Sequence, residues 1–68
     1  MSEKTYFVME IVGSSTKSIE DAIHGAIADA QKKVEHVRWF EVLETRGHVE
    51  NNKVAHFQVK VAIGYLNE

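Results

Sequence analysis

The sequence predicts an α+β domain of order β-α-β-β, in which a three-stranded antiparallel sheet is covered on one face by a single helix. Apolar residues recur at three- and four-residue steps between positions 19 and 37, as in an amphipathic helix. Strand-like segments lie before and after it, and paired asparagines at 51–52 separate the last two. Because 68 residues hold only one core, we expect one domain over residues 1–68.

The first strand is predicted at residues 5–12, a stretch rich in aromatic and β-branched side chains. Alternation places Phe7, Met9 and Ile11 on one face of this strand. The polar residues 13–17 are interpreted as a loop. This loop is not a Walker phosphate-binding motif, since the second glycine and the Gly-Lys-Ser/Thr ending are missing.

The helix is expected to begin after Ser18, a typical N-cap, with Asp21 following in the Ser-x-x-Asp form of the capping box. Its apolar stripe extends to residue 37, and the alanines in the stripe let the helix lie close to a sheet. The stripe contains Ile19, Ala22, Ile23, Ala26, Ile27, Ala30, Val34 and Val37.

The second and third strands are predicted at residues 39–49 and 54–66. The two asparagines between them tolerate left-handed backbone and favour a tight hairpin. The last strand is expected in the centre of the sheet because one of its faces is apolar throughout. That face contains Ala55, Phe57, Val59, Val61 and Ile63.

Trp39, the only tryptophan, is expected on the sheet face away from the helix. Alternation assigns Phe40 and Val42 to the helix side, and Trp39, Leu43 and Thr45 to the open side. An indole on the open side is either covered by another subunit or stacked on a planar ligand. A chain this short is marginally stable alone and has no cysteine for disulfides, so we expect a homo-oligomer.

Gln58 is also expected on the open side, where pairing about the asparagines places it opposite Thr45, six residues from Trp39. This separation is about 20 Å at roughly 3.3 Å per residue. A site that uses both side chains would therefore have to be assembled across a subunit interface. The alternative from spacing alone is that both residues simply pack in that interface.

The four histidines are interpreted as solvated or hydrogen-bonded rather than as metal ligands, so we expect no metal site. His48 and His56 are near each other across the hairpin, but strand parity places them on opposite faces unless a bulge intervenes. His24 and His36 lie twelve residues apart, about 18 Å along a helix.

Other functional classes are disfavoured by composition. No cysteine nucleophile or paired serine and histidine is evident, so we expect no enzyme. A net charge of −2 without a basic stripe argues against nucleic acid as the main partner. No stretch approaches a membrane span and the N-terminus lacks an apolar signal region, so we expect a soluble, cytoplasmic protein.

Over essentially its full length the chain resembles the dodecins, a family of small flavin-binding proteins. The tryptophan motif and the downstream glutamine are the most specific features. The resemblance rests on Glu10-Ile11-Val12-Gly13 with Ser14 and Ser15, the alanine-rich helix, Trp39-Phe40-Glu41-Val42, Arg46-Gly47-His48, Ala55-His56-Phe57-Gln58-Val59 and Gly64-Tyr65.

The resemblance implies a hollow homo-dodecamer that binds flavin pairs at two-fold interfaces for storage, buffering and photoprotection, without catalysis. It implies that Trp39 stacks on the isoalloxazine and that Gln58 hydrogen-bonds the polar edge of the ring. FMN is the expected cofactor. Riboflavin and FAD stay as alternatives, because Leu66 stands where relatives often have an arginine that can meet a phosphate. Arg46 is the remaining family-matched cation, although strand parity places it on the helix side unless a bulge turns it outward. The competing interpretation is a ligand-free assembly module with Trp39 as an interface anchor.

Overall fold

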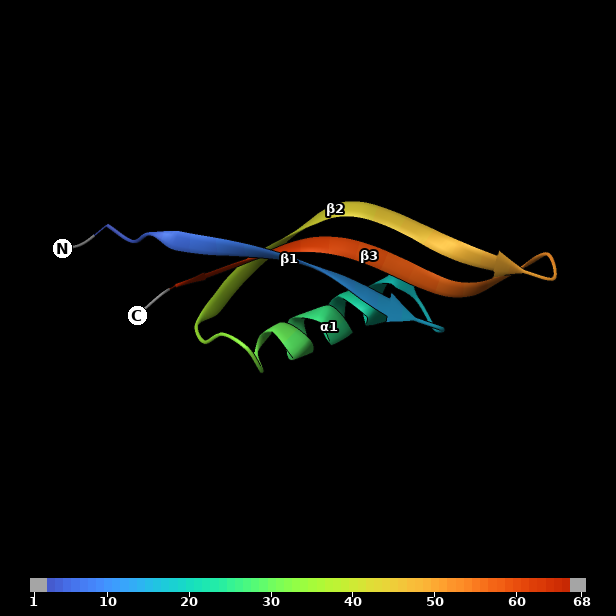
Figure 1. Ribbon diagram of the computed structural model, residues 1–68, viewed down its shortest axis with the longest axis horizontal. Helices are drawn as coiled ribbons and strands as arrows, with labels where there is room; N and C mark the ends of the chain where they lie inside the picture. The colour runs from blue at the N-terminus through green and yellow to red at the C-terminus, as the bar shows by residue number, and fades with distance from the viewer. Residues whose placement is uncertain (1–2, 67–68) are drawn as a thin grey trace.

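The computed structural model describes residues 3–66 and has the predicted β-α-β-β order (Figure 1). The sheet is antiparallel with strand order β1-β3-β2, so the last strand is central, as predicted. The long β2–β3 hairpin extends past the end of β1, and α1 lies along one face of the sheet. The elements are β1 (Tyr6–Ser15), α1 (Ile19–Ala30), β2 (Val37–Glu50) and β3 (Lys53–Leu66).

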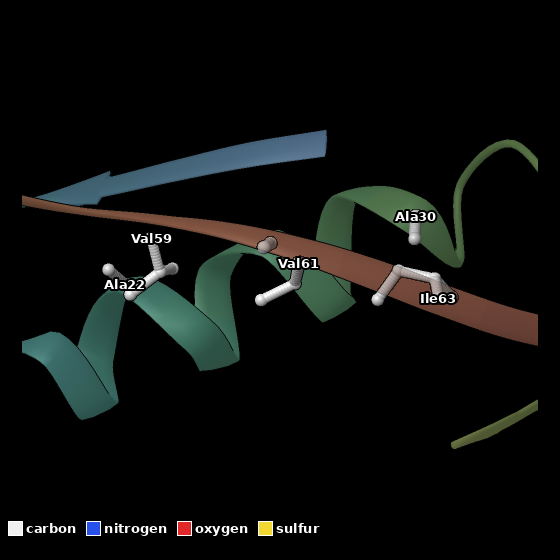
Figure 2. Packing of buried hydrophobic residues seen from close by; sticks show 6 residues of the cluster. Ala22, Ala30, Val59, Val61 and Ile63 are labelled. Atoms are coloured by element: carbon white, nitrogen blue, oxygen red, sulfur yellow. The ribbon is translucent and has the colours of Figure 1, made fainter. Parts of the chain in front are cut away.

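The core lies between α1 and the central strand. Val59, Val61 and Ile63 of β3 are fully buried and point toward the helix, where they meet its alanines (Figure 2). The helix contributes Ala22, Ala26 and Ala30 to this cluster. Small side chains on α1 let the helix backbone approach the sheet closely, which explains why the stripe is alanine-rich.

Ser18 caps the N-terminus of α1 as predicted, but the predicted capping box is not closed, because the Ser18 N–H donates to Ser15 Oγ at 3.4 Å and not to the Asp21 carboxylate. The Ser18 hydroxyl accepts a hydrogen bond from the Asp21 backbone N–H at 2.9 Å. The Asp21 carboxylate accepts one from the Ser15 hydroxyl at 2.7 Å. These contacts satisfy exposed donors at the helix start and join the end of β1 to the helix.

The predicted helix end is wrong. The helix ends at Ala30, and the next residues form tight turns in which the N–H of Lys33 donates to the Ala30 carbonyl at 2.9 Å. His36 then adopts a left-handed backbone with φ 63°, which redirects the chain into β2. Val37 still packs against the core, but from β2. Its helical spacing was therefore misleading.

The predicted loop at 13–17 is also partly wrong, because β1 continues through Ser15. Gly13 is buried and pairs with Val59 directly beneath the helix. A Cβ at Gly13 would overlap the carbonyl oxygen of Ala22 and lie 2.9 Å from the Cβ of Ala26. The glycine is therefore part of a close strand–helix contact.

We expect Gly13→Ala to destabilise the protein by about 1–3 kcal/mol, as overpacking does where backbone must move. Gly25→Ala is the matched control, since nothing lies within 4 Å of a Cβ there. Removing a helical glycine should stabilise by roughly 0.5–1 kcal/mol. Chemical denaturation of both variants tests this. Equal stability of the two would contradict the close contact.

The hairpin turn follows the sequence prediction. Asn51 and Asn52 both have positive φ, 52° and 63°, as a two-residue type I′ turn requires. Glu50 and Lys53 pair directly across the turn. The turn therefore fixes the starting register of β2 against β3.

Three register shifts interrupt the β2–β3 pairing, at Arg38, Leu43 and Ala55, and the last two overturn predicted face assignments. Ala55 has no direct partner on β2, and Leu43 has none on β3. Consequently the cross-strand partner of Gln58 is Arg46, and not Thr45 as predicted. Thr45 pairs with Val59 on the helix side. Arg46 lies on the open side. The bulges at Leu43 and Ala55 place it there, whereas Gly47 itself is regularly paired with Phe57.

The helix side of β2 is left uncovered. Phe40 and Val42 lie on that side, as predicted, but are 45% and 39% exposed. The reason is that α1 packs on β1 and β3. Large apolar side chains are exposed on both sheet faces, which is typical of a surface that meets another molecule. No helix within residues 3–66 is long and apolar enough to cross a membrane.

Candidate functional site

The candidate site is the sheet face opposite α1, called here the open face. Residues paired across the strands share a face, so the register defines its rows. From the termini toward the hairpin these rows are Val8–Gly64–Trp39, Glu10–Ala62–Glu41, Val12–Lys60–Glu44, Ser14–Gln58–Arg46 and His56–His48.

The indole of Trp39 lies directly over Gly64. A Cβ at Gly64 would overlap the indole atoms Cε2, Cζ2 and Nε1. The indole is 39% exposed, and the ring of Tyr6 meets it edge-on at a centroid distance of 6.3 Å. The absence of a side chain at Gly64 therefore lets the ring rest on the sheet, where Tyr6 supports one edge. An accessible aromatic surface results.

Arg46 and Gln58 are joined by a side-chain hydrogen bond. The Arg46 Nε–H donates to Gln58 Oε1 at 3.1 Å. Because the guanidinium engages the amide oxygen, the Gln58 –NH₂ group is left to donate to a ligand. Gln58 is half-buried and Arg46 is exposed, so the pair presents polar groups at the surface of the open face.

The structure keeps Trp39 and Gln58 apart, as predicted. Trp39 pairs with Gly64, and Gln58 lies six residues from Gly64 along β3. The separation is about 20 Å at roughly 3.3 Å per residue. One chain therefore does not bring both to the same small ring system, and a site that uses both needs a second copy.

The rows between them are charged. Lys60 Nζ lies 3.7 Å from a Glu10 carboxylate oxygen. Glu41 and Glu44 are exposed on the neighbouring strand. These groups show no arrangement of base and nucleophile. Within residues 3–66, no group of three or more His, Asp or Glu side chains is arranged to hold a metal ion.

His48 and His56 face each other, contrary to the parity-based expectation. The unpaired Ala55 shifts the register so that the two histidines are direct cross-strand partners. Their ring centroids are 6.1 Å apart and their planes are tilted by 44°. His48 Nε2 also lies 3.2 Å from Glu50 Oε2.

Sequence reasoning missed Gly64, Tyr6 and the Arg46–Gln58 contact. Tyr6 and Gly64 could have been found from the sequence. With β3 as the central strand, the alternation of side chains places both residues on the same sheet face as Trp39. The Arg46–Gln58 contact had no such signal, since it depends on where the bulges fall.

Comparison with known proteins identifies the family. The family model Dodecin matches residues 5–68. The dodecin of Thermus thermophilus is 40% identical over 65 residues, covering 96% of this chain and 94% of that protein. The dodecin structure from Streptomyces coelicolor superposes with a TM-score of 0.94 at 38% identity, covering 100% of this chain and 97% of the other.

A more distant structure, the calcium dodecin of Mycobacterium tuberculosis, has a TM-score of 0.81 at 26% identity, covering 94% and 91% of the two chains. That protein is described as calcium-chelating. Dodecins are in general small flavin-binding proteins that assemble as dodecamers. With a family match over residues 5–68, 40% identity to a dodecin over nearly the whole chain and the same fold as a dodecin structure, this chain belongs to the dodecin family.

Proposed function

We propose that the protein stores and buffers flavin, and protects it from light, by stacking the isoalloxazine on Trp39. The observation that carries the proposal is the exposed indole held over Gly64 on an open sheet face. Two copies related by a two-fold axis would sandwich a pair of flavins between their indoles. An indole in van der Waals contact donates an electron to the excited flavin, which quenches it.

We further propose that the chain assembles as a dodecamer before flavin binds. Support comes from the exposed apolar side chains on both faces, among them Phe40 and Val42 beside the edge of β2. Twelve copies would bury surfaces that a small domain cannot cover itself. Native mass spectrometry of flavin-free protein at micromolar concentration should show a dodecamer, and a monomer would refute the assembly.

The decisive experiment is a flavin titration. Purified protein mixed with FMN should form a yellow, one-flavin-per-chain complex with strongly quenched fluorescence. The competing function is a ligand-free assembly module in which Trp39 anchors a subunit interface. That module would leave flavin fluorescence unchanged while assembling normally.

Gln58 is proposed to hydrogen-bond the polar edge of the ring. Gln58→Ala should weaken binding by about 0.5–1.5 kcal/mol, less than loss of the indole, because one net hydrogen bond is removed. The variant should also discriminate less among ring-edge analogues. Titration with lumichrome and a deazaflavin measures this. Identical ligand preferences in the wild type and the variant would contradict the role.

Arg46 is proposed to position the Gln58 amide through the 3.1 Å hydrogen bond. Riboflavin, which has no phosphate, separates this role from phosphate binding. If Arg46 acts through Gln58, Arg46→Ala should weaken the binding of riboflavin and of FMN equally. The expected loss of affinity is up to about tenfold, which is 1.4 kcal/mol. A loss confined to FMN that disappears at high salt would instead assign Arg46 to the phosphate.

FMN is the proposed cofactor, and riboflavin and FAD are the alternatives. Leu66 is buried and apolar, so it offers no charge to a phosphate. We therefore propose that wild-type affinities for FMN and riboflavin agree within about tenfold. Cytoplasmic location and the absence of a nucleic-acid partner stay predictions from the sequence.

A further inference from the structure

We propose that His48 and His56 form a two-histidine binding site for a divalent transition metal, such as Zn²⁺, Ni²⁺ or Cu²⁺, near the tip of the hairpin. Neutral imidazole nitrogen is a preferred ligand of these ions. The two side chains are direct cross-strand partners on the same face, because Ala55 bulges out of register. All four histidines of the chain lie within the described residues, and this is their only paired arrangement there.

The ring geometry is close to that of a chelate. The centroids lie 6.1 Å apart. Two imidazoles on one tetrahedral ion, with metal–nitrogen bonds of about 2.0–2.1 Å, have centroids about 5 Å apart. Both side chains are exposed, so small rotations close this difference. Beyond Ser15 and Phe57 the hairpin is a two-stranded ribbon without a β1 partner, which leaves room for the ion and its waters.

Glu50 is a positioning residue for this site. Its carboxylate oxygen lies 3.2 Å from His48 Nε2 and accepts a hydrogen bond from the Nε2–H tautomer. This tautomer leaves the other ring nitrogen, Nδ1, free to bind metal, and a carboxylate behind an imidazole fixes the tautomer and the orientation of the ring. Glu50 pairs directly with Lys53, and Arg46 lies one row from the histidines on the other side, so the carboxylate offsets positive charge beside the ion.

Within one chain the site is far from the stacking position at Trp39, although His56 lies only two residues from Gln58, so the titration is done without flavin. His56 lies eight residues from Gly64 along β3, about 26 Å at roughly 3.3 Å per residue. Two protein ligands leave the remaining coordination positions to water. Ca²⁺ prefers six to eight oxygen ligands, so it should not bind to this pair. The proposal therefore distinguishes transition metals from calcium.

The test is isothermal titration of flavin-free, full-length protein with ZnCl₂, repeated with CaCl₂. We expect one Zn²⁺ per chain, weaker binding as pH falls because protons compete for the imidazoles, and no Ca²⁺ binding at this pair. His48→Gln and His56→Gln should each reduce Zn²⁺ affinity at least tenfold. Glu50→Gln should reduce it less.

His24→Gln is the matched control. His24 Nε2 lies 4.0 Å from a Glu20 carboxylate oxygen, so this pair has an imidazole and a carboxylate but no second imidazole. His24→Gln should therefore leave Zn²⁺ binding unchanged. Native mass spectrometry checks that each variant keeps the wild-type assembly. Equal Zn²⁺ affinity in wild type and His56→Gln, or equal losses in the His24 and His56 variants, would overturn the site whether or not flavin binds.

Discussion

Trp39→Ala is expected to remove most of the flavin affinity and most of the fluorescence quenching. Stacking a planar base on an aromatic side chain is worth about 1–3 kcal/mol, or roughly 5- to 150-fold in affinity. The indole is accessible for such stacking because it lies over Gly64 on the open face. The neighbouring ring of Tyr6 is inclined by 68° to the indole, so it does not offer a parallel stacking surface at the same place.

Fluorescence titration with FMN measures both effects. Trp39→Phe is the graded control, because phenyl keeps an aromatic surface but is smaller and a poorer electron donor. It should retain part of the affinity and less of the quenching. Native mass spectrometry separates loss of stacking from loss of assembly. If Trp39→Ala assembles normally and binds flavin as tightly as wild type, the stacking role is wrong.

Much of the fold was predictable because local signals agreed with each other. Ser18 and the apolar stripe identified the helix start, and the two asparagines identified the turn. The unbroken apolar face of β3 identified the central strand. The helix end was not predictable from periodicity, since Val37 fits the helical spacing but reaches the core from β2.

Bulges limited what could be predicted of the site. Trp39 and Phe40 were assigned to the correct faces because they lie before the bulge at Leu43. Their cross-strand partners, Gly64 and Ile63, lie on the open side and the helix side as alternation predicts. Past Leu43 the extra residue moves every later side chain of β2 to the other face. This displaced Arg46 from its predicted side. The unpaired Ala55 likewise brought His48 opposite His56, and no local residue pattern marks either bulge.

Gly64→Ala is expected to reduce flavin affinity nearly as much as Trp39→Ala, although the tryptophan is retained. The new Cβ would overlap three indole atoms, so the ring must leave its place over the strand. Because the indole is 39% exposed, it can rotate outward without moving backbone. The substitution should therefore affect binding far more than stability. This is the reverse of Gly13→Ala, where the obstacle is the carbonyl of Ala22.

Paired measurements of FMN affinity and thermal stability on Gly64→Ala and Gly13→Ala test this contrast, with Gly25→Ala as the control that should leave FMN affinity unchanged. Gly64→Ala should lose roughly 5- to 150-fold in affinity, as for removal of the stacked ring, while keeping the wild-type assembly. Intrinsic tryptophan fluorescence should shift to longer wavelength as the indole becomes more solvated. Wild-type affinity in Gly64→Ala would mean that the position of the indole over Gly64 is not the one that receives flavin.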